Sequence, residues 1–282
     1  MKKFAAFLLI ILCALLFWQQ SKKKNPPFPH VAFIPIEKYT TSALPCFYIE
    51  LEKRSVLAEL DLGMKRCVVL DQALFESLSE KSFSREEEMI SLNGKSQPMS
   101  LSFIAPIQIG PLTFHHLEAG IKDQNYYADS DLFVGSNGID HPPCTLGWSL
   151  FSTSNLVLDF RRHQIGFSDD LETLNTHLSD KFISTPLLEH DDFLEIQVLT
   201  DSGPLRCILD TGCTWNMIQS DLKSDVFETE ELKISGVNFG PTQFHPWKID
   251  LPNRVDAILG MEFLYNQTCF IDFAKKSVYF SR

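Results

Sequence analysis

The sequence predicts an all-β protein built from two related lobes within one chain. Short apolar or alternating runs are broken by 15 prolines and 13 glycines, a pattern typical of short strands and turns. Sequence blocks from the first half of the chain recur in the same order in the second half. Each half also carries an aspartate two residues before a glycine, at the end of an apolar run. These observations together favour two lobes of one design.

Composition narrows the classes of function. The chain has 282 residues, enough for one large domain or two small ones, with 44% hydrophobic and 22% charged residues. A net charge of −11 argues against a nucleic-acid-binding surface. The cysteine spacing does not resemble a zinc site, and no phosphate-binding glycine loop is present. We therefore expect neither a metal nor a cofactor.

The N-terminus predicts export. Residues 4–18 are apolar throughout and are followed by Lys22–Lys24. As a helix, these residues would rise about 22 Å, short of the roughly 30 Å hydrocarbon core of a bilayer. Residues 1–24 therefore form a signal peptide or a signal anchor, and the lack of a small-x-small cleavage site favours the anchor. A lipoprotein site at Cys13 is disfavoured by Leu12. The rest of the chain is expected on the periplasmic or extracellular side, or secreted if the segment is cleaved.

Four further segments are expected after residue 24: a proline-rich spacer at 25–43, a first lobe at 44–168, an acidic linker at 169–191 and a second lobe at 192–282. Six of the seven cysteines lie outside the apolar N-terminal run. An exported location permits disulfides, but the sequence leaves buried thiols equally open.

The internal repeat has five matched blocks. The separation of counterparts falls along the chain, from 149 positions for Asp61 and Asp210 to 130 for Gly110 and Gly240 and 113 for Gly147 and Gly260. The first copy is therefore longer by 19 residues between its aspartate and its Gly-Pro. Five blocks in one order predict that the lobes arose by duplication. Outside the strands, we expect a short helix over 71–78 with Asp71 as N-cap, and matching helical turns at 147–151 and 260–264.

Asp210-Thr211-Gly212 is the motif that carries chemistry. An apolar run, Cys207–Leu209, precedes it and predicts a buried strand that ends at the aspartate. The carboxylate would lie at the bottom of a cleft, and the glycine permits a tight backbone approach. The threonine hydroxyl between them can lock the loop through hydrogen bonds.

This motif and its surroundings resemble retropepsin-like and pepsin-like aspartic proteases. The likeness covers residues 193–280 well and residues 46–168 more weakly. It implies two retropepsin-like acid-protease β-barrel lobes packed as a pseudo-dimer within one monomeric chain. It also implies that Asp210 is catalytic. The hydroxyl groups of Thr211 and Thr214 would then support the loop that carries it. The implied substrate is a peptide or an unfolded protein, and the implied activity is that of an endopeptidase on exported or membrane proteins.

The resemblance implies a second carboxylate, because the mechanism needs one acid and one base that share a proton. The repeat offers Asp61, followed by Gly63, at the matching site. The family's supporting apolar-Gly segment matches Leu146-Gly147 in the first copy and Leu259-Gly260 in the second. The extra residues of the first copy include Leu92-Asn93-Gly94, a hairpin signal where the family carries a flap over the cleft. An ordinary surface hairpin is the other interpretation.

The first copy departs from the family pattern. Leu62 replaces the middle threonine, so we expect a one-sided loop lock. Met64 and Lys65 follow, and a lysine near the two carboxylates would favour their ionised forms. Three hypotheses therefore remain: an active two-lobed peptidase, an inactive lobe pair that binds peptide or a partner at the membrane, and an enzyme that dimerises through its second lobes.

Overall fold

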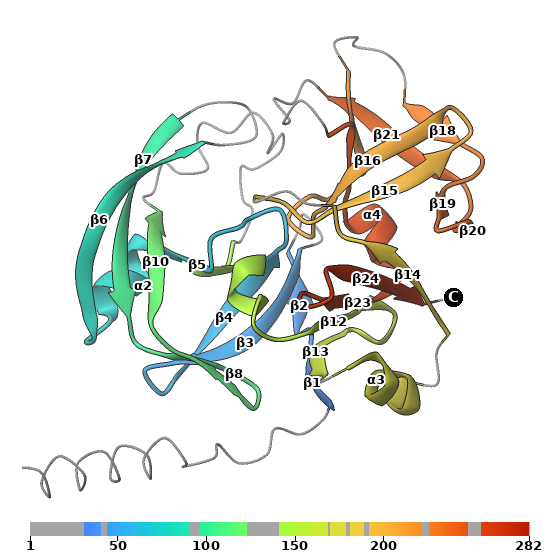
Figure 1. Cartoon of the computed structure of the whole chain (residues 1–282). Helices are drawn as coiled ribbons and strands as arrows, with labels where there is room; N and C mark the ends of the chain where they lie inside the picture. The colour runs from blue at the N-terminus through green and yellow to red at the C-terminus, as the bar shows by residue number, and fades with distance from the viewer. Residues whose placement is uncertain are drawn as a thin grey trace, which may run out of the picture.

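The computed structural model describes residues 31–40, 44–90, 96–122, 141–168, 170–178, 181–188, 192–220, 226–247 and 255–281. Two β-rich lobes are joined by a third sheet (Figure 1). None of the helices in these ranges is long and apolar enough to span a membrane. The apolar run at 4–18 lies outside the described residues.

The first lobe is one sheet of ten described strands, with the order β6-β7-β10-β5-β11-β4-β3-β8-β9 and β2 paired to β3. Its strands are β2 (Lys38–Tyr39), β3 (Pro45–Leu51), β4 (Arg54–Asp61), β5 (Val68–Asp71), β6 (Lys81–Ile90), β7 (Ser96–Ile104), β8 (Ile107–Ile109), β9 (Leu112–Phe114), β10 (Leu117–Lys122) and β11 (Cys144–Gly147). The short helix α2 (Gln72–Ser77) follows β5. The Asp71 carboxylate accepts a 2.6 Å hydrogen bond from the backbone N–H of Leu74, which confirms the predicted N-cap.

The second lobe repeats this arrangement with fewer and shorter strands, in the order β18-β21-β17-β22-β16-β15-β19-β20. Its strands are β15 (Glu195–Thr200), β16 (Gly203–Leu209), β17 (Met217–Gln219), β18 (Phe227–Thr229), β19 (Lys233–Ile234), β20 (Val237–Asn238), β21 (Thr242–Trp247) and β22 (Ala257–Leu259). The parallel pair β16·β22 corresponds to the parallel pair β4·β11 of the first lobe. The matched sequence blocks thus hold matching places, and their origin by duplication stays a prediction.

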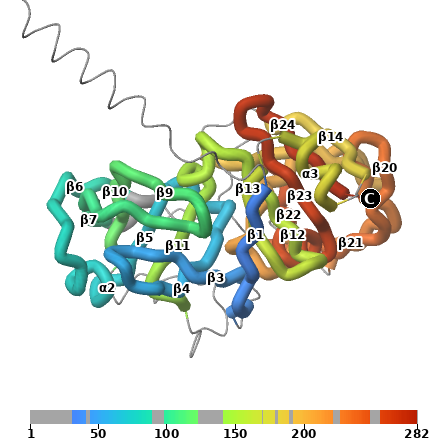
Figure 2. The backbone as a smooth tube through the Cα atoms, turned by 90° about the horizontal axis from the view of Figure 1, so that it is seen from below, coloured from blue at the N-terminus to red at the C-terminus, as the bar shows by residue number. Residues whose placement is uncertain are grey.

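The third sheet joins the lobes and has the order β1-β13-β12-β23-β24-β14. Its strands are β1 (Val31–Pro35), β12 (Leu156–Asp159), β13 (Gln164–Ser168), β14 (Phe182–Pro186), β23 (Thr268–Asp272) and β24 (Ser277–Ser281). The matched strands β12 and β23 pair antiparallel with each other, with Val157 opposite Phe270. Figure 2 shows these strands running side by side between the two lobes. Antiparallel pairing of matched strands relates the lobes by an approximate twofold axis.

The other helical segments of the described residues are also short. They are η1 (Trp148–Phe151), η2 (Phe160–Arg162), α3 (Leu171–Leu178) and α4 (Met261–Leu264). The segments η1 and α4 each follow a glycine, Gly147 and Gly260, which confirms the two predicted helical turns.

Two segments expected to lack regular structure contain it. The predicted spacer at 25–43 includes β1 and β2, and β1 pairs with β13 because its apolar run from Val31 to Ile34 follows the last of the clustered prolines and is free to extend a sheet. The predicted acidic linker at 169–191 includes α3, which buries Leu174, and β14, which pairs with β24. The acidic residues alone suggested a linker, but the apolar residues between them are enough to dock both elements onto the third sheet.

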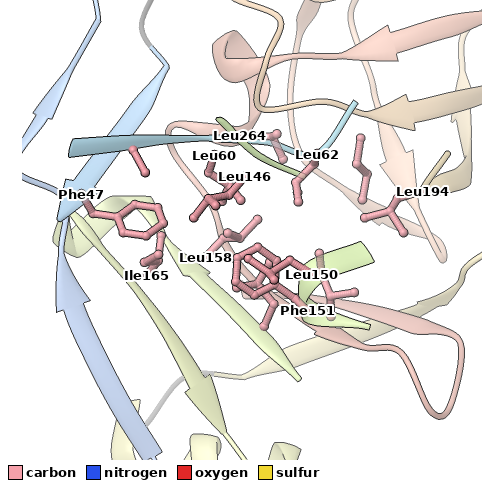
Figure 3. Packing of buried hydrophobic residues seen from close by; sticks show 14 of the residues in the cluster. Phe47, Leu60, Leu62, Leu146, Leu150, Phe151, Leu158, Ile165, Leu194 and Leu264 are labelled. Atoms are coloured by element: carbon pink, nitrogen blue, oxygen red, sulfur yellow. The ribbon is translucent and has the colours of Figure 1, made fainter. Parts of the chain in front are cut away.

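The main hydrophobic core runs through both lobes. Leu60, Leu62 and Leu146 of the first lobe gather near Leu264 of the second (Figure 3), and all four are at most 1% exposed. Burial of this apolar surface is the main favourable term that holds the lobes together. The six cysteines of the described residues form no disulfide with one another. Four are buried, Cys46, Cys144, Cys207 and Cys269, and two are partly exposed, Cys67 and Cys213.

Candidate active site

The two aspartates lie at the ends of corresponding strands. Asp61 is the last residue of β4, and Asp210 directly follows β16. Alternation along each strand places the aspartates on the face opposite the main core. Gly147 lies opposite Asp61 in the β11·β4 register, and the Asp210 N–H donates to the Leu259 carbonyl at 3.1 Å. Both predicted supporting segments therefore lie directly beside an aspartate.

Each supporting glycine lets a loop pass close to it. A Cβ atom on Gly147 would collide with the Arg66 carbonyl, and one on Gly260 would collide with the Trp215 carbonyl. Only glycine can occupy either position without moving the loop that follows the aspartate.

Equivalent backbone hydrogen bonds complete the support. The Trp148 N–H donates to the Met64 carbonyl at 3.0 Å, and the Met261 N–H donates to the Cys213 carbonyl at 2.8 Å. Leu146, which precedes Gly147, is fully buried and anchors its segment in the core.

The carboxyl groups of Asp61 and Asp210 meet and share a hydrogen bond. One oxygen of Asp210, Oδ1, also accepts from the backbone N–H of Gly63 at 3.1 Å and of Gly212 at 2.7 Å. The two glycines press on the pair from opposite sides. A Cβ atom on Gly63 would lie 2.5 Å from Asp210 Cγ, and one on Gly212 would collide with the Asp61 carboxylate.

The pair is asymmetric in its proton affinity. Burial raises the pKa of Asp61 well above its usual range, and the negative charges of Asp210 and Glu59 raise it further. Burial also raises the pKa of Asp210, but hydrogen bonds from Gly212, Asp61 and Gly63 oppose the rise. The two backbone N–H donors to Asp210 Oδ1 favour Asp210 as the ionised member, with the shared proton on Asp61. A close pair with one acid and one base can activate a water molecule.

Thr211 locks the two aspartate loops together. Its hydroxyl is fully buried, accepts from the Leu62 N–H at 2.9 Å and donates to the Leu60 carbonyl at 2.8 Å. Both partners lie in the other lobe. Leu62 packs in the main core at 0% exposure and has no hydroxyl to return the bonds. The predicted one-sided lock is confirmed.

Lys65 points to a different partner from the one expected. Its ammonium lies 3.1 Å from Asp192 Oδ1 in an exposed ion pair, and this pairing draws the lysine charge toward the start of the second lobe. The expectation that Lys65 ionises the catalytic pair is not supported by this geometry. Thr214 lies in the loop after Asp210, where its carbonyl accepts from the Glu262 N–H at 3.0 Å.

The extra residues of the first copy form the hairpin β6·β7, which pairs from Lys81 and Ile104 up to Ile90 and Ser96. An ion pair of 3.1 Å between Arg66 and Glu87 ties β6 to the loop that follows Asp61. Leu92, Asn93 and Gly94, the predicted flap tip, lie outside the described residues. Their role over the site stays a prediction.

The role of one buried amide, on Asn216, was not predicted from the sequence. The Asn216 side chain, 1% exposed, accepts from the Gly260 N–H at 3.0 Å and donates to Glu262 Oε2 at 3.2 Å. It thereby fixes the Leu-Gly segment under the Asp210 loop. The signal in the sequence is an asparagine next to the apolar residues Met217 and Ile218.

Within the described part of the chain, no three histidine, cysteine, aspartate or glutamate side chains are grouped to hold a metal ion. No protein-family model and no curated protein matches the sequence. Among solved structures, the chain is similar to the aspartic proteinase from Irpex lacteus, with a TM-score of 0.57 and 12% sequence identity. The match covers 89% of this chain and 97% of that one. The chain therefore has the all-β, two-lobed fold of an aspartic proteinase.

Proposed function

We propose that the protein is an aspartic-type endopeptidase that uses Asp61 and Asp210 as its catalytic pair. The observation that carries this proposal is the shared hydrogen bond between the two carboxyl groups, with Asp210 held by two backbone N–H groups. The pair is formed within one chain, which favours a monomeric enzyme over one that must dimerise. The apolar N-terminus predicts export of the chain, so we propose that its substrates are exported or membrane proteins, cleaved as peptides or unfolded chains.

The chemistry follows from the proton positions. A water molecule between the carboxyl groups gives a proton to ionised Asp210 and its oxygen attacks the peptide carbonyl carbon. Asp61 gives its proton to the carbonyl oxygen, which produces a tetrahedral diol. Asp210 then passes its proton to the peptide nitrogen, the C–N bond breaks, and a diol hydroxyl returns a proton to Asp61. The pair ends as it began.

The pH dependence of cleavage tests this assignment. Activity needs a single proton on the pair, so it falls at low pH when Asp210 is protonated and at high pH when Asp61 loses its proton. Because burial and neighbouring charge raise the pKa of Asp61, we expect the high-pH limb above the usual aspartate range of about 4. The measurement is cleavage of a broad peptide library by the exported part of the chain, with kcat/KM followed from pH 3 to 8. Absence of cleavage at every pH would favour the non-catalytic binding protein instead.

Gly212 gives a second test, of geometry. The methyl group of Gly212→Ala would displace the Asp61 carboxylate, so we expect kcat to fall by about 100-fold or more with a small change in Tm. Gly203→Ala is the matched control, because Gly203 has a positive φ of 123° but no atom within 4 Å of an added Cβ. That variant should lose stability and keep its kcat. Wild-type cleavage by Gly212→Ala would contradict the proposed arrangement of the pair.

A further inference from the structure

A buried polar cluster lies in the first lobe, beside Asp61. Glu59, two residues before Asp61 on β4, is 2% exposed, and strand alternation puts both side chains on the same face, about 7 Å apart along the strand. Thr145 of β11 lies opposite Glu59 in the parallel register and donates to its Oε1 at 2.7 Å. The Lys122 ammonium, at the end of β10, donates to the Thr145 hydroxyl at 3.3 Å, and His141 Nδ1 lies 3.2 Å from Glu59 Oε2.

The second lobe fills the same place with apolar side chains. Ile208 and Ile258 occupy the repeat positions of Glu59 and Thr145 and pair in the same parallel register. They pack with Met217 in a small apolar cluster beside Asp210. The fold therefore does not require charged or polar side chains at these positions, since apolar side chains fill them in the second lobe.

Charged groups at the same place are costly, because a buried carboxylate and a buried ammonium each lose several kcal/mol of hydration. Lys122 is 4% exposed, and Glu59 is no more accessible. Only the first lobe bears this desolvation cost. The charged cluster therefore has a role that the apolar cluster of the second lobe cannot perform.

We propose that Glu59, fixed in place by Thr145, is a positioning residue that holds the shared proton of the catalytic pair on Asp61, and that Lys122 limits this effect. Glu59 makes ionisation of Asp61 unfavourable by like-charge repulsion, and Lys122 moderates this effect with the opposite charge. The second lobe lacks both charges, so the ionised form is left to Asp210. The network of Glu59, Thr145 and Lys122 thus breaks the symmetry of two equivalent aspartates and assigns the acid and base roles. The proposal rests on the proposed function only where it speaks of catalysis.

The electrostatic environment agrees with this reading. After burial and the charge of Asp210, the charge of Glu59 is the next contribution that raises the pKa of Asp61. Burial lowers the pKa of Lys122, while Glu59, Cys144, Asp71 and Asp61 raise it in that order. Among the described residues, the titratable groups that face this region include Asp210 from the second lobe, Glu59 on β4, His141 before β11, Asp71 on β5 and Lys122 on β10.

The test uses two variants with shifts of opposite sign. Glu59→Gln removes the repulsion and leaves the Lys122 charge uncompensated, so the high-pH limb of kcat/KM should move down by about one pH unit. Lys122→Gln leaves Glu59 uncompensated, so the same limb should move up by a similar amount. Each variant tests the proposed network by itself, because the two expected shifts of the high-pH limb have opposite signs. A structural role would lower Tm in both variants and leave the limb where it is, and that result would overturn the proposal.

A readout independent of cleavage separates this inference from the proposed function. The carboxyl carbon of Asp61 is followed by NMR in ¹³C-labelled protein, with the signal assigned by its loss in Asp61→Asn. The titration midpoint should rise in the order Glu59→Gln, wild type, Lys122→Gln. This order in a protein that cleaves nothing would uphold the network and reject the peptidase. Unchanged midpoints in a protein that does cleave would reject the network and uphold the peptidase.

Discussion

Asp210→Asn and Asp61→Asn are each expected to reduce kcat/KM for peptide cleavage by at least about 10³-fold. The first substitution removes the base that accepts the proton of water, and the second removes the acid that protonates the substrate carbonyl. Because the two carboxyl groups share one hydrogen bond and one proton, neither can replace the other. The measurement is kcat/KM at the optimum pH of the wild-type protein.

The thermal stability of Asp61→Asn should not fall with its activity. The folded-state pKa of Asp61 is raised, so the folded protein binds a proton that the unfolded chain has released, and stability falls as pH rises through this window. Asp61→Asn removes that penalty. Its Tm at pH 7 should equal or exceed that of wild type, and the difference should vanish near pH 3, where both states are protonated.

Asp192→Asn is the matched control, since this exposed aspartate pairs with Lys65 next to the catalytic loop. An exposed ion pair contributes little, so activity should stay within about twofold of wild type. Cleavage that survives Asp61→Asn but not Asp210→Asn would mean that the second carboxylate comes from elsewhere, such as a second copy of the chain.

The sequence was sufficient for the fold class and for the main parts of the site. Matched sequence blocks aligned Asp61 with Asp210 because both lobes keep the same order of strands, although the connections between them differ in length. The helical turns after Gly147 and Gly260 were predicted for the same reason. The one-sided lock was predictable because Leu62 has no hydroxyl, whatever its surroundings.

Other features depended on which side chains meet in three dimensions. Glu59 lies in an apolar run where strand alternation leaves one face polar, and only packing of β10 and β11 against it brings Lys122 and Thr145 near. The Lys65 partner, Asp192, is 127 positions away in the sequence, so the sequence did not reveal that this lysine has an ion-pair partner outside the catalytic pair. Long-range polar contacts of this kind leave no periodic signal in the sequence.

Thr211→Val is expected to cause the largest loss of stability. Valine keeps the shape of threonine but leaves the Leu62 N–H and the Leu60 carbonyl buried without the partner they have now. Each such group costs about 1–3 kcal/mol, so the free energy of unfolding should fall by roughly 2–6 kcal/mol and Tm by about 5–15 °C. We also expect kcat to fall tenfold or more with little change in KM, because the lock fixes the relative position of the two aspartate loops. The measurements are chemical denaturation, Tm and steady-state kinetics.

Thr211→Ser is the control, because it keeps the hydroxyl and both hydrogen bonds and loses one methyl group. It should remain within about 1.5 kcal/mol of wild type, with kcat nearly unchanged. In a symmetric lock, a second threonine would hold the loops after one hydroxyl was lost. Leu62 cannot do so, and the hydroxyl lock between the loops depends on a single oxygen atom. Equal stability and activity of the valine and serine variants would show that core packing around Leu62, rather than the Thr211 hydroxyl, holds the catalytic pair in register.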